Sequence, residues 1–356
     1  MTVIGAASFA YLRPTFVSTP KQASPSVNRS LVTTDYVAYD FVSPAVGWAL
    51  DFVQGPSSNS GQFMVFRTVD AAKRWLKQLT VQGQFCGFSP LAVRFFDEMH
   101  GFIAVRCPTE QLYRTSDGGA HWDSVALPSP QVEVIAFSDP SYGWLLAQPT
   151  TNRQARNLYS TRDAGSTWQR LPDPPLDAYA LSFRRPNEAL MAGDGPGPPY
   201  VYTSSDAGQN WQRHDLPPPP SVSWDSGSYF PPSVQVLPGA GAVVSVDSQG
   251  GQSVTFLFMS IDGGATWRYV KPPPGPVAYQ DLSHWWATKG SMLFKSSDAG
   301  ETWTQVTNKL PDSQYLLYVL DSQHAWASVS VLGGYGLAFS GDGGLHWTRA
   351  TVPLSG

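Results

Sequence analysis

Carboxylate side chains are the groups in this chain that could do chemistry, because a carboxylate can act as a general acid, a general base or a nucleophile. The 356 residues include 27 Asp and Glu. Hydrolysis of a glycosidic bond needs two carboxyl groups that face each other across the sugar. Ten aspartates fall in predicted turns, and candidates such as Asp51, Asp194 and Asp225 remain in predicted loops. No spacing in the sequence pairs two of them, so no glycosidase site is predicted.

Other catalytic patterns are also missing from the sequence. The six histidines show no metal-ligand spacing, and His100, His284 and His324 occupy one repeated position, which indicates a structural role. The nucleophile-elbow and P-loop patterns are absent. Gly193–Gly197 resembles a phosphate-binding loop, but Pro196 within it and Pro198 and Pro199 after it lack the N–H groups that phosphate binding needs. We therefore expect no cofactor and no metal.

Seven aspartates share one motif, Ser/Thr-x-Asp-x-Gly-x-x-Trp, which is called a box below and is exemplified by Thr115–Trp122. The first copy has Ala72 in place of the Gly. The box aspartates are Asp70, Asp117, Asp163, Asp206, Asp262, Asp298 and Asp342. The box tryptophans are Trp75, Trp122, Trp168, Trp211, Trp267, Trp303 and Trp347. Successive box aspartates are 36 to 56 residues apart, and repeats at such intervals indicate an array of one supersecondary unit.

Turn chemistry accounts for the box without catalysis, because Asp bonds the N–H groups of its own turn and Gly supplies a positive φ. Apolar residues precede each box and an alternating pattern follows the Trp, which predicts a hairpin. A second hairpin lies upstream of every box, with a small residue and then a large one, as in Gly47-Trp48 and Gly143-Trp144. Asp97, Asp139 and Asp321 sit in the turns of these hairpins. Two hairpins per period predict an all-β fold, a seven-bladed β-propeller of four-stranded antiparallel blades.

Length and charge agree with one large domain that covers residues 31–356. The formal net charge of -4 gives no support to nucleic-acid binding, and no segment is long and apolar enough to span a membrane. Residues 1–30 are read as an apolar stub followed by a Pro- and Ser-containing linker. The stub is either what remains of an incomplete signal or anchor, or a frayed terminus. The first interpretation predicts a protein outside the cytoplasm, secreted or tethered to the envelope.

Cys86 and Cys107 flank the upstream hairpin of the second blade. The predicted strands place both beyond the same end of that hairpin, so a disulfide is geometrically reasonable. Two unrelated buried thiols are the alternative. A bridge would agree with an oxidising compartment.

The boxes resemble the Asp-box, or BNR, repeats of bacterial sialidases, sortilin-type receptors, xyloglucanases and photosystem II assembly and stability factors. With a Gly-Trp strand upstream of a box, residues 35–351 are most similar to the last group, which implies a seven-bladed scaffold. Those factors look lipid-anchored or lumen-targeted and carry a basic patch, but this chain shows neither a lipidated Cys nor a basic cluster. Sialidases have a Phe/Tyr-Arg-Ile-Pro motif, and Tyr11–Pro14 matches it poorly.

Departures from the repeat are where we expect binding, because the fold does not need them. The segment His214–Ser233 accounts for the longest interval between boxes and is called the insertion below. Its Trp224, Asp225, Tyr229 and Phe230 offer a rigid aromatic surface near the central opening of the disc, or else fold down to plug it. Trp285 replaces the small residue of its hairpin, and it either fills a packing gap or projects at the turn.

The sequence thus predicts a monomeric, non-catalytic binding or assembly scaffold with a protein or glycan partner on one disc face. By resemblance, it would serve an envelope or photosynthetic membrane complex, and it would reach a membrane only through a missing N-terminal anchor. The alternative is a carbohydrate-active hydrolase of the sialidase or xyloglucanase type.

Overall fold

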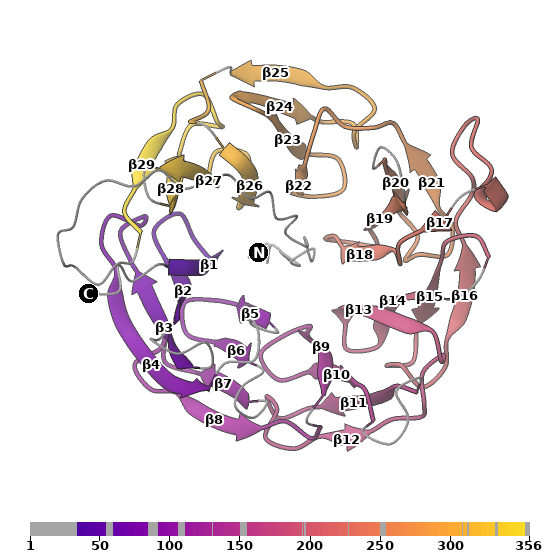
Figure 1. The fold of residues 1–356 in the computed structure, drawn as a ribbon, viewed down its shortest axis with the longest axis horizontal. Coiled ribbons are helices and arrows are strands. Elements are labelled where there is room, and N and C mark those ends of the chain that lie inside the picture. The colour runs from indigo at the N-terminus through magenta and orange to yellow at the C-terminus, as the bar shows by residue number, and fades with distance from the viewer. Residues whose placement is uncertain are drawn as a thin grey trace.

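The computed structural model describes residues 34–54, 60–84, 92–105, 111–129, 131–149, 155–193, 195, 197–226, 228–249, 254–307, 309–311, 313–331 and 334–352. Seven antiparallel sheets follow one another around a ring, with the last beside the first (Figure 1). The predicted seven-bladed β-propeller is confirmed. The predicted stub and linker of residues 1–30 lie outside the described residues, as do Cys86 and Cys107, so the linker and the disulfide stay predictions.

Blades 1 to 7 are each written from the axis outward. Blade 1 is β1 (Thr34–Phe41), β2 (Gly47–Gln54), β3 (Ser60–Thr68) and β4 (Leu76–Gln84), and blade 2 is β5 (Ala92–Phe95), β6 (Gly101–Val105), β7 (Gln111–Thr115) and β8 (Asp123–Ala126). Blade 3 is β9 (Val132–Phe137), β10 (Gly143–Ala147), β11 (Asn157–Thr161) and β12 (Gln169–Arg170), and blade 4 is β13 (Ala178–Arg185), β14 (Glu188–Gly193), β15 (Tyr200–Ser204) and β16 (Gln212–Asp215). Blade 5 is β18 (Ser233–Val236), β19 (Ala242–Gln249), β20 (Thr255–Ser260) and β21 (Arg268–Val270), with the 3-10 helix η1 (Trp224–Ser226) and the extra strand β17 (Ser228–Tyr229) before it. Blade 6 is β22 (Val277–Tyr279), β23 (Trp285–Lys289), β24 (Met292–Ser296) and β25 (Thr304–Thr307), and blade 7 is β26 (Ser313–Val319), β27 (Ala325–Val331), β28 (Gly334–Ser340) and β29 (Thr348–Ala350).

Each box joins the third strand of its blade to the fourth, so all seven lie on one face of the disc, called the box face below. In blade 2, the hydroxyl of Thr115 donates to Asp117 Oδ1 (2.9 Å) and accepts the N–H of Gly119 (2.8 Å). The same Oδ1 accepts the N–H of His121 (2.9 Å). The second carboxylate oxygen accepts a side-chain donor from the residue before the Trp. Those donors are Arg74, His121, Thr167, Asn210, Thr266, Thr302 and His346.

The two residues after each box Asp have positive φ, from Ala71 (58°) and Ala72 (64°) to Gly343 (76°) and Gly344 (88°). The second of them faces the previous blade. A Cβ on Gly344 would lie 2.3 Å from a methyl group of Leu293. Gly is therefore favoured there for its backbone conformation and for the close approach of the neighbouring blade.

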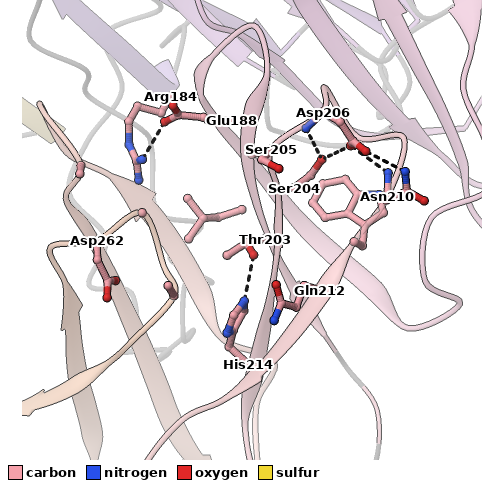
Figure 2. A pocket seen from close by; sticks show the side chains of 16 residues that line it. Arg184, Glu188, Thr203, Ser204, Ser205, Asp206, Asn210, Gln212, His214 and Asp262 are labelled. Atoms are coloured by element: carbon pink, nitrogen blue, oxygen red, sulfur yellow. Dashed lines mark hydrogen bonds and ion pairs between the residues drawn. The ribbon is translucent and has the colours of Figure 1, made fainter.

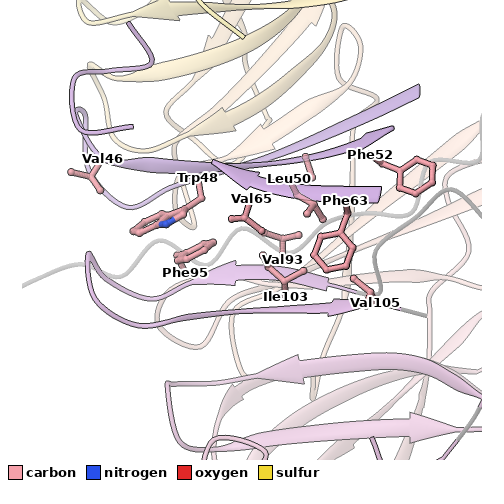
Figure 3. Close-up of a cluster of buried hydrophobic side chains, with 11 residues drawn as sticks. Val46, Trp48, Leu50, Phe52, Phe63, Val65, Val93, Phe95, Ile103 and Val105 are labelled. Carbon is pink, nitrogen blue, oxygen red and sulfur yellow. The ribbon is translucent and has the colours of Figure 1, made fainter. Parts of the chain in front are cut away.

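Neighbouring blades meet through a second repeated contact. Phe95 pairs with Gly101 across β5 and β6, and its ring covers that glycine, whose added Cβ would lie 2.1 Å from the ring. The other face of the ring receives Trp48 of blade 1, with centroids 3.8 Å apart and planes 4° apart (Figure 3). The small residue of the upstream hairpin thus leaves room for a ring, and the large residue stacks on the next blade.

The last seam closes the ring in the same way. Trp326 of blade 7 stacks on Phe41 of blade 1 at 3.9 Å and 10°, and Phe41 covers Gly47. The indole N–H of Trp75 donates to the carbonyl oxygen of Thr351 (2.9 Å). Every blade consists of consecutive strands within the described residues, so side-chain packing and these few bonds close the propeller.

The tryptophans divide into two classes. Those of the upstream hairpins are fully buried, as at Trp48 (0% exposed) and Trp144 (1%), whereas the box tryptophans are half-buried. Trp285 is also fully buried, and its indole N–H donates to the carbonyl oxygen of Asp281 (3.1 Å). Trp285 packs against side chains of blade 5, so it fills a gap between blades 5 and 6.

The hydrogen bonds of the box aspartates should stabilise the folded state. Asp262 accepts bonds from the hydroxyl of Ser260 (2.8 Å) and from the backbone N–H and hydroxyl of Thr266 (2.9 and 2.6 Å). We expect Asp262→Ala to lower the free energy of unfolding by about 1 to 3 kcal/mol, because turn donors lose their acceptor. Urea unfolding would measure this, with the exposed Asp225→Ala as control. Equal loss in both variants would contradict a special role for the box.

Candidate functional site

The hairpin aspartates hold their own turns. Asp97, Asp281 and Asp321 each accept the N–H of a histidine three residues on, and the same histidine's Nδ1 lies 2.9 to 3.0 Å from the carboxylate. Asp139 accepts the N–H of Tyr142 in the same way (2.9 Å). The pairs recur as part of the repeat, so the predicted structural role of these histidines is confirmed. No group of three or more potential metal ligands occurs in the described part of the chain.

Of the three aspartates predicted in loops, Asp194 lies outside the described residues and Asp225 is exposed. The prediction was wrong for Asp51, which lies in β2 and is 0% exposed. Neither of its carboxylate oxygens has a hydrogen-bond partner among the described residues. Burial raises the pKa of Asp51 to about 6, and the nearby backbone N–H of Phe52 opposes this only in part. Asp51 is thus mostly ionised at pH 7, although its burial disfavours the charged form.

The insertion lies on the face opposite the boxes, because β17 pairs with Ser248 and Gln249 at the far end of β19. Its expected course near the central opening is wrong. Figure 1 shows η1 and β17 toward the rim, between β16 and β21, whereas β18 approaches the centre. The insertion therefore covers the outer part of the seam between blades 4 and 5.

Trp224 points into that seam and is 7% exposed. Its indole N–H donates to the carbonyl oxygen of Leu216 (2.9 Å), and its ring meets Tyr229 edge-on at 4.7 Å and Phe256 at 5.6 Å. The ring is therefore a wedge between blades rather than a contact surface. Tyr229 is half-buried, and Phe230 (47% exposed) and Asp225 are open to solvent.

A groove on the box face lies in the same seam, with a volume of about 530 Å³ (Figure 2). Its walls include Arg184 and Glu188 of blade 4, the pair Thr203 and His214, and the box aspartates Asp206 and Asp262. Arg184 Nη1 lies 2.9 Å from Glu188 Oε2, and Thr203 Oγ1 lies 2.9 Å from His214 Nε2. The sequence did not predict this groove, which forms between residues of two blades.

The groove lacks the pair of carboxyl groups that a glycosidase needs. Hydrogen bonds from Thr266 hold the pKa of Asp262 down to about 2, and bonds from Asn210 and Ser204 outweigh partial burial and lower that of Asp206. Glu188 is paired with Arg184. A general acid needs a raised pKa, so neither aspartate suits that role.

Asp51 makes stability depend on pH. Its folded-state pKa of about 6 exceeds the ordinary value of about 4, so the folded state binds a proton first and stability should rise as pH falls from 7 to 4. We expect Asp51→Asn to raise the free energy of unfolding at pH 7.5 by about 1 to 2 kcal/mol, because it removes a buried charge. Urea titrations of both proteins at several pH values would test this. Parallel pH profiles of the two proteins would refute it. The box aspartates do not interfere, because their titration changes stability only below about pH 4.

The wedge should show in stability too. Trp224→Ala should lower the free energy of unfolding by about 3 to 5 kcal/mol, as expected for a buried Trp. Phe230→Ala, in the same insertion but exposed, should change it by less than about 1 kcal/mol. Thermal or urea unfolding of both variants decides between the two roles of Trp224. If its ring were a free surface, both variants would change the free energy of unfolding only slightly.

Comparison with known proteins shows what part of the chain is similar to in sequence. Residues 67–218 match the family model of the photosynthesis system II assembly factor YCF48. The photosystem II assembly lipoprotein Ycf48 of Synechococcus sp. (strain CC9902) is 32% identical over 87 residues, which cover 23% of this chain and 24% of that relative.

Two solved structures share the architecture. YCF48 bound to a D1 peptide has a TM-score of 0.54 at 16% identity and covers 93% of this chain and 100% of its own. The GH74 xyloglucanase of Xanthomonas campestris has a TM-score of 0.53 at 14% identity and covers 91% of this chain and 61% of its own. The chain is an Asp-box, seven-bladed β-propeller that is similar in sequence and fold to the Ycf48 photosystem II assembly factors.

Proposed function

We propose that this protein is a non-catalytic scaffold that binds a polypeptide segment of a partner during the assembly or maintenance of a membrane complex outside the cytoplasm. The match of residues 67–218 to the Ycf48 family carries the proposal. The Ycf48 structure bound to a D1 peptide supports a protein partner, because it has the same fold.

The chemistry of the chain also favours a scaffold over a hydrolase. The box and hairpin aspartates are acceptors for their own turns, and the carboxylates of the groove are ion-paired or held at low pKa. A xyloglucanase shares the fold, but one fold hosts unrelated activities.

The exposed part of the insertion is the contact surface that we propose. The N–H of Phe230 donates to Asp247 (2.8 Å), and the N–H of Ser248 donates to Val254 (2.9 Å), so both apolar side chains lie at the same end of β19. Phe230 and Val254 are 47% and 44% exposed, and Asp225 adds a polar group nearby in the chain. Trp224, which is buried against Tyr229 and Phe256, anchors the insertion, and an anchored segment loses less entropy on binding.

Capture of partners from native membranes would test the proposal. The wild-type chain, fixed to a resin, should retain a membrane polypeptide that Phe230→Ala loses by at least tenfold while its melting temperature stays unchanged. Ile261→Ala is the matched control, because Ile261 is exposed in blade 5 on the box face. Hydrolysis of xyloglucan or of a sialoside by the purified chain would overturn the proposal, as would equal capture by all three proteins.

A further inference from the structure

The groove between blades 4 and 5 lies where three other seams hold a cation of the chain itself. In several blades the residue just before the box Ser or Thr is a long cation that reaches the next blade. Arg114 Nη1 donates to the carbonyl oxygens of Asp163 (3.2 Å) and Ala164 (2.9 Å) in the following box. Arg67 reaches the carbonyl oxygen of Glu98 (3.2 Å), and Lys295 that of Ser322 (3.2 Å). The seam beside a box is thus a place where this fold binds guanidinium and ammonium groups.

Blade 4 has Thr203 at that position, and its short side chain bonds His214 instead of crossing the seam. The groove opens where a longer side chain would lie. Arg184 reaches the seam from the inner strand, where its Nη1 is 3.3 Å from an added Cβ on Gly263. Its side chain is 8% exposed and ion-paired with Glu188, whose other carboxylate oxygen lies 3.5 Å from Arg185 Nη1. Arg184 therefore leaves open the volume along Thr203.

The walls also carry uncompensated negative charge. In blades 1, 2 and 7 the box Asp has a basic partner, namely Arg74, His121 or His346. Asp206 and Asp262, on either side of the groove, are bonded only to neutral donors, the amide of Asn210 and the hydroxyl of Thr266 among them. Arg184 offers an anion little accessible charge, because its side chain is 8% exposed and its Nη1 is paired with Glu188.

We propose that this groove binds the side chain of a lysine or arginine from the partner polypeptide. The side chain would enter as Arg67 and Arg114 enter their seams, with its stem along Thr203 and its charge between the two box carboxylates. The identity of the ligand as part of a partner rests on the proposed function, whereas the cation preference rests on the groove alone. The insertion lies on the opposite face, so the two surfaces are separate.

Titration of the full chain with small amides tests the groove without any partner. The probes are N-acetyl-arginine amide, N-acetyl-lysine amide and the neutral isostere N-acetyl-citrulline amide. Trp211 lines the groove, and its indole N–H has no hydrogen-bond partner among the residues that the structure describes. This N–H provides an NMR signal that Trp211→Phe assigns. We expect saturable shifts with the two cations and at least tenfold weaker binding of citrulline amide.

Thr203→Arg should fill the groove with the chain's own cation and weaken binding of both cationic amides at least tenfold. Gln169→Arg, which adds the same charge at an exposed position of β12, should leave binding unchanged. Equal binding of citrulline and arginine amides, wild-type affinity in Thr203→Arg, or no saturable shift would each overturn the proposal. If the chain binds the amides but captures no membrane polypeptide, the cation preference of the groove is supported and the proposed function is refuted.

Discussion

The propeller depends on one repeated contact, a flat ring that lies over a residue with almost no side chain and is covered in turn by a ring from the previous blade. Phe41 over Gly47, with Trp326 on its other face, shows the arrangement at the seam that closes the disc. Stacked aromatic pairs contribute about 0.5 to 1.5 kcal/mol beyond their burial. The closing seam needs this contribution, because among the described strands neither blade 1 nor blade 7 takes a strand from the other end of the chain.

The stack does not run through every seam. Aromatic pairs join blades 7 to 1, 1 to 2, 2 to 3 and 3 to 4, as in Trp144 on Phe183 at 3.4 Å. Between blades 4 and 5 the two positions hold Leu190 and Val236, which pack in a small aliphatic cluster. Trp224 enters this same seam from the insertion and buries its ring between the blades. The insertion therefore replaces, from the other face, the aromatic contact that the repeat lacks here.

The sequence predicted what is local and repeated. A box consists of eight consecutive residues whose bonds stay within the turn, so its fold and the role of Asp262 or Asp298 followed from spacing alone. The strand β2 could also have been read from its apolar run, which would have placed Asp51 in the interior. The groove could not, because it exists only when Thr203 of one blade meets Asp262 of the next. The course of the insertion likewise depends on a seam between distant residues, which no local pattern encodes.

Two candidate binding surfaces occupy opposite faces of one seam, and both arise where blade 4 departs from the repeat. In blade 3 a stacked ring fills the seam, and in blade 2 a cation, Arg114, lies beside the next box. A departure therefore leaves surface free without weakening the turns around it. The carboxylates of Asp206 and Asp262 are fixed by their own box bonds whether or not a ligand is present. Because these charges are held in place before binding, a partner side chain would meet a preorganised site, and little of its binding free energy would be lost in ordering the protein.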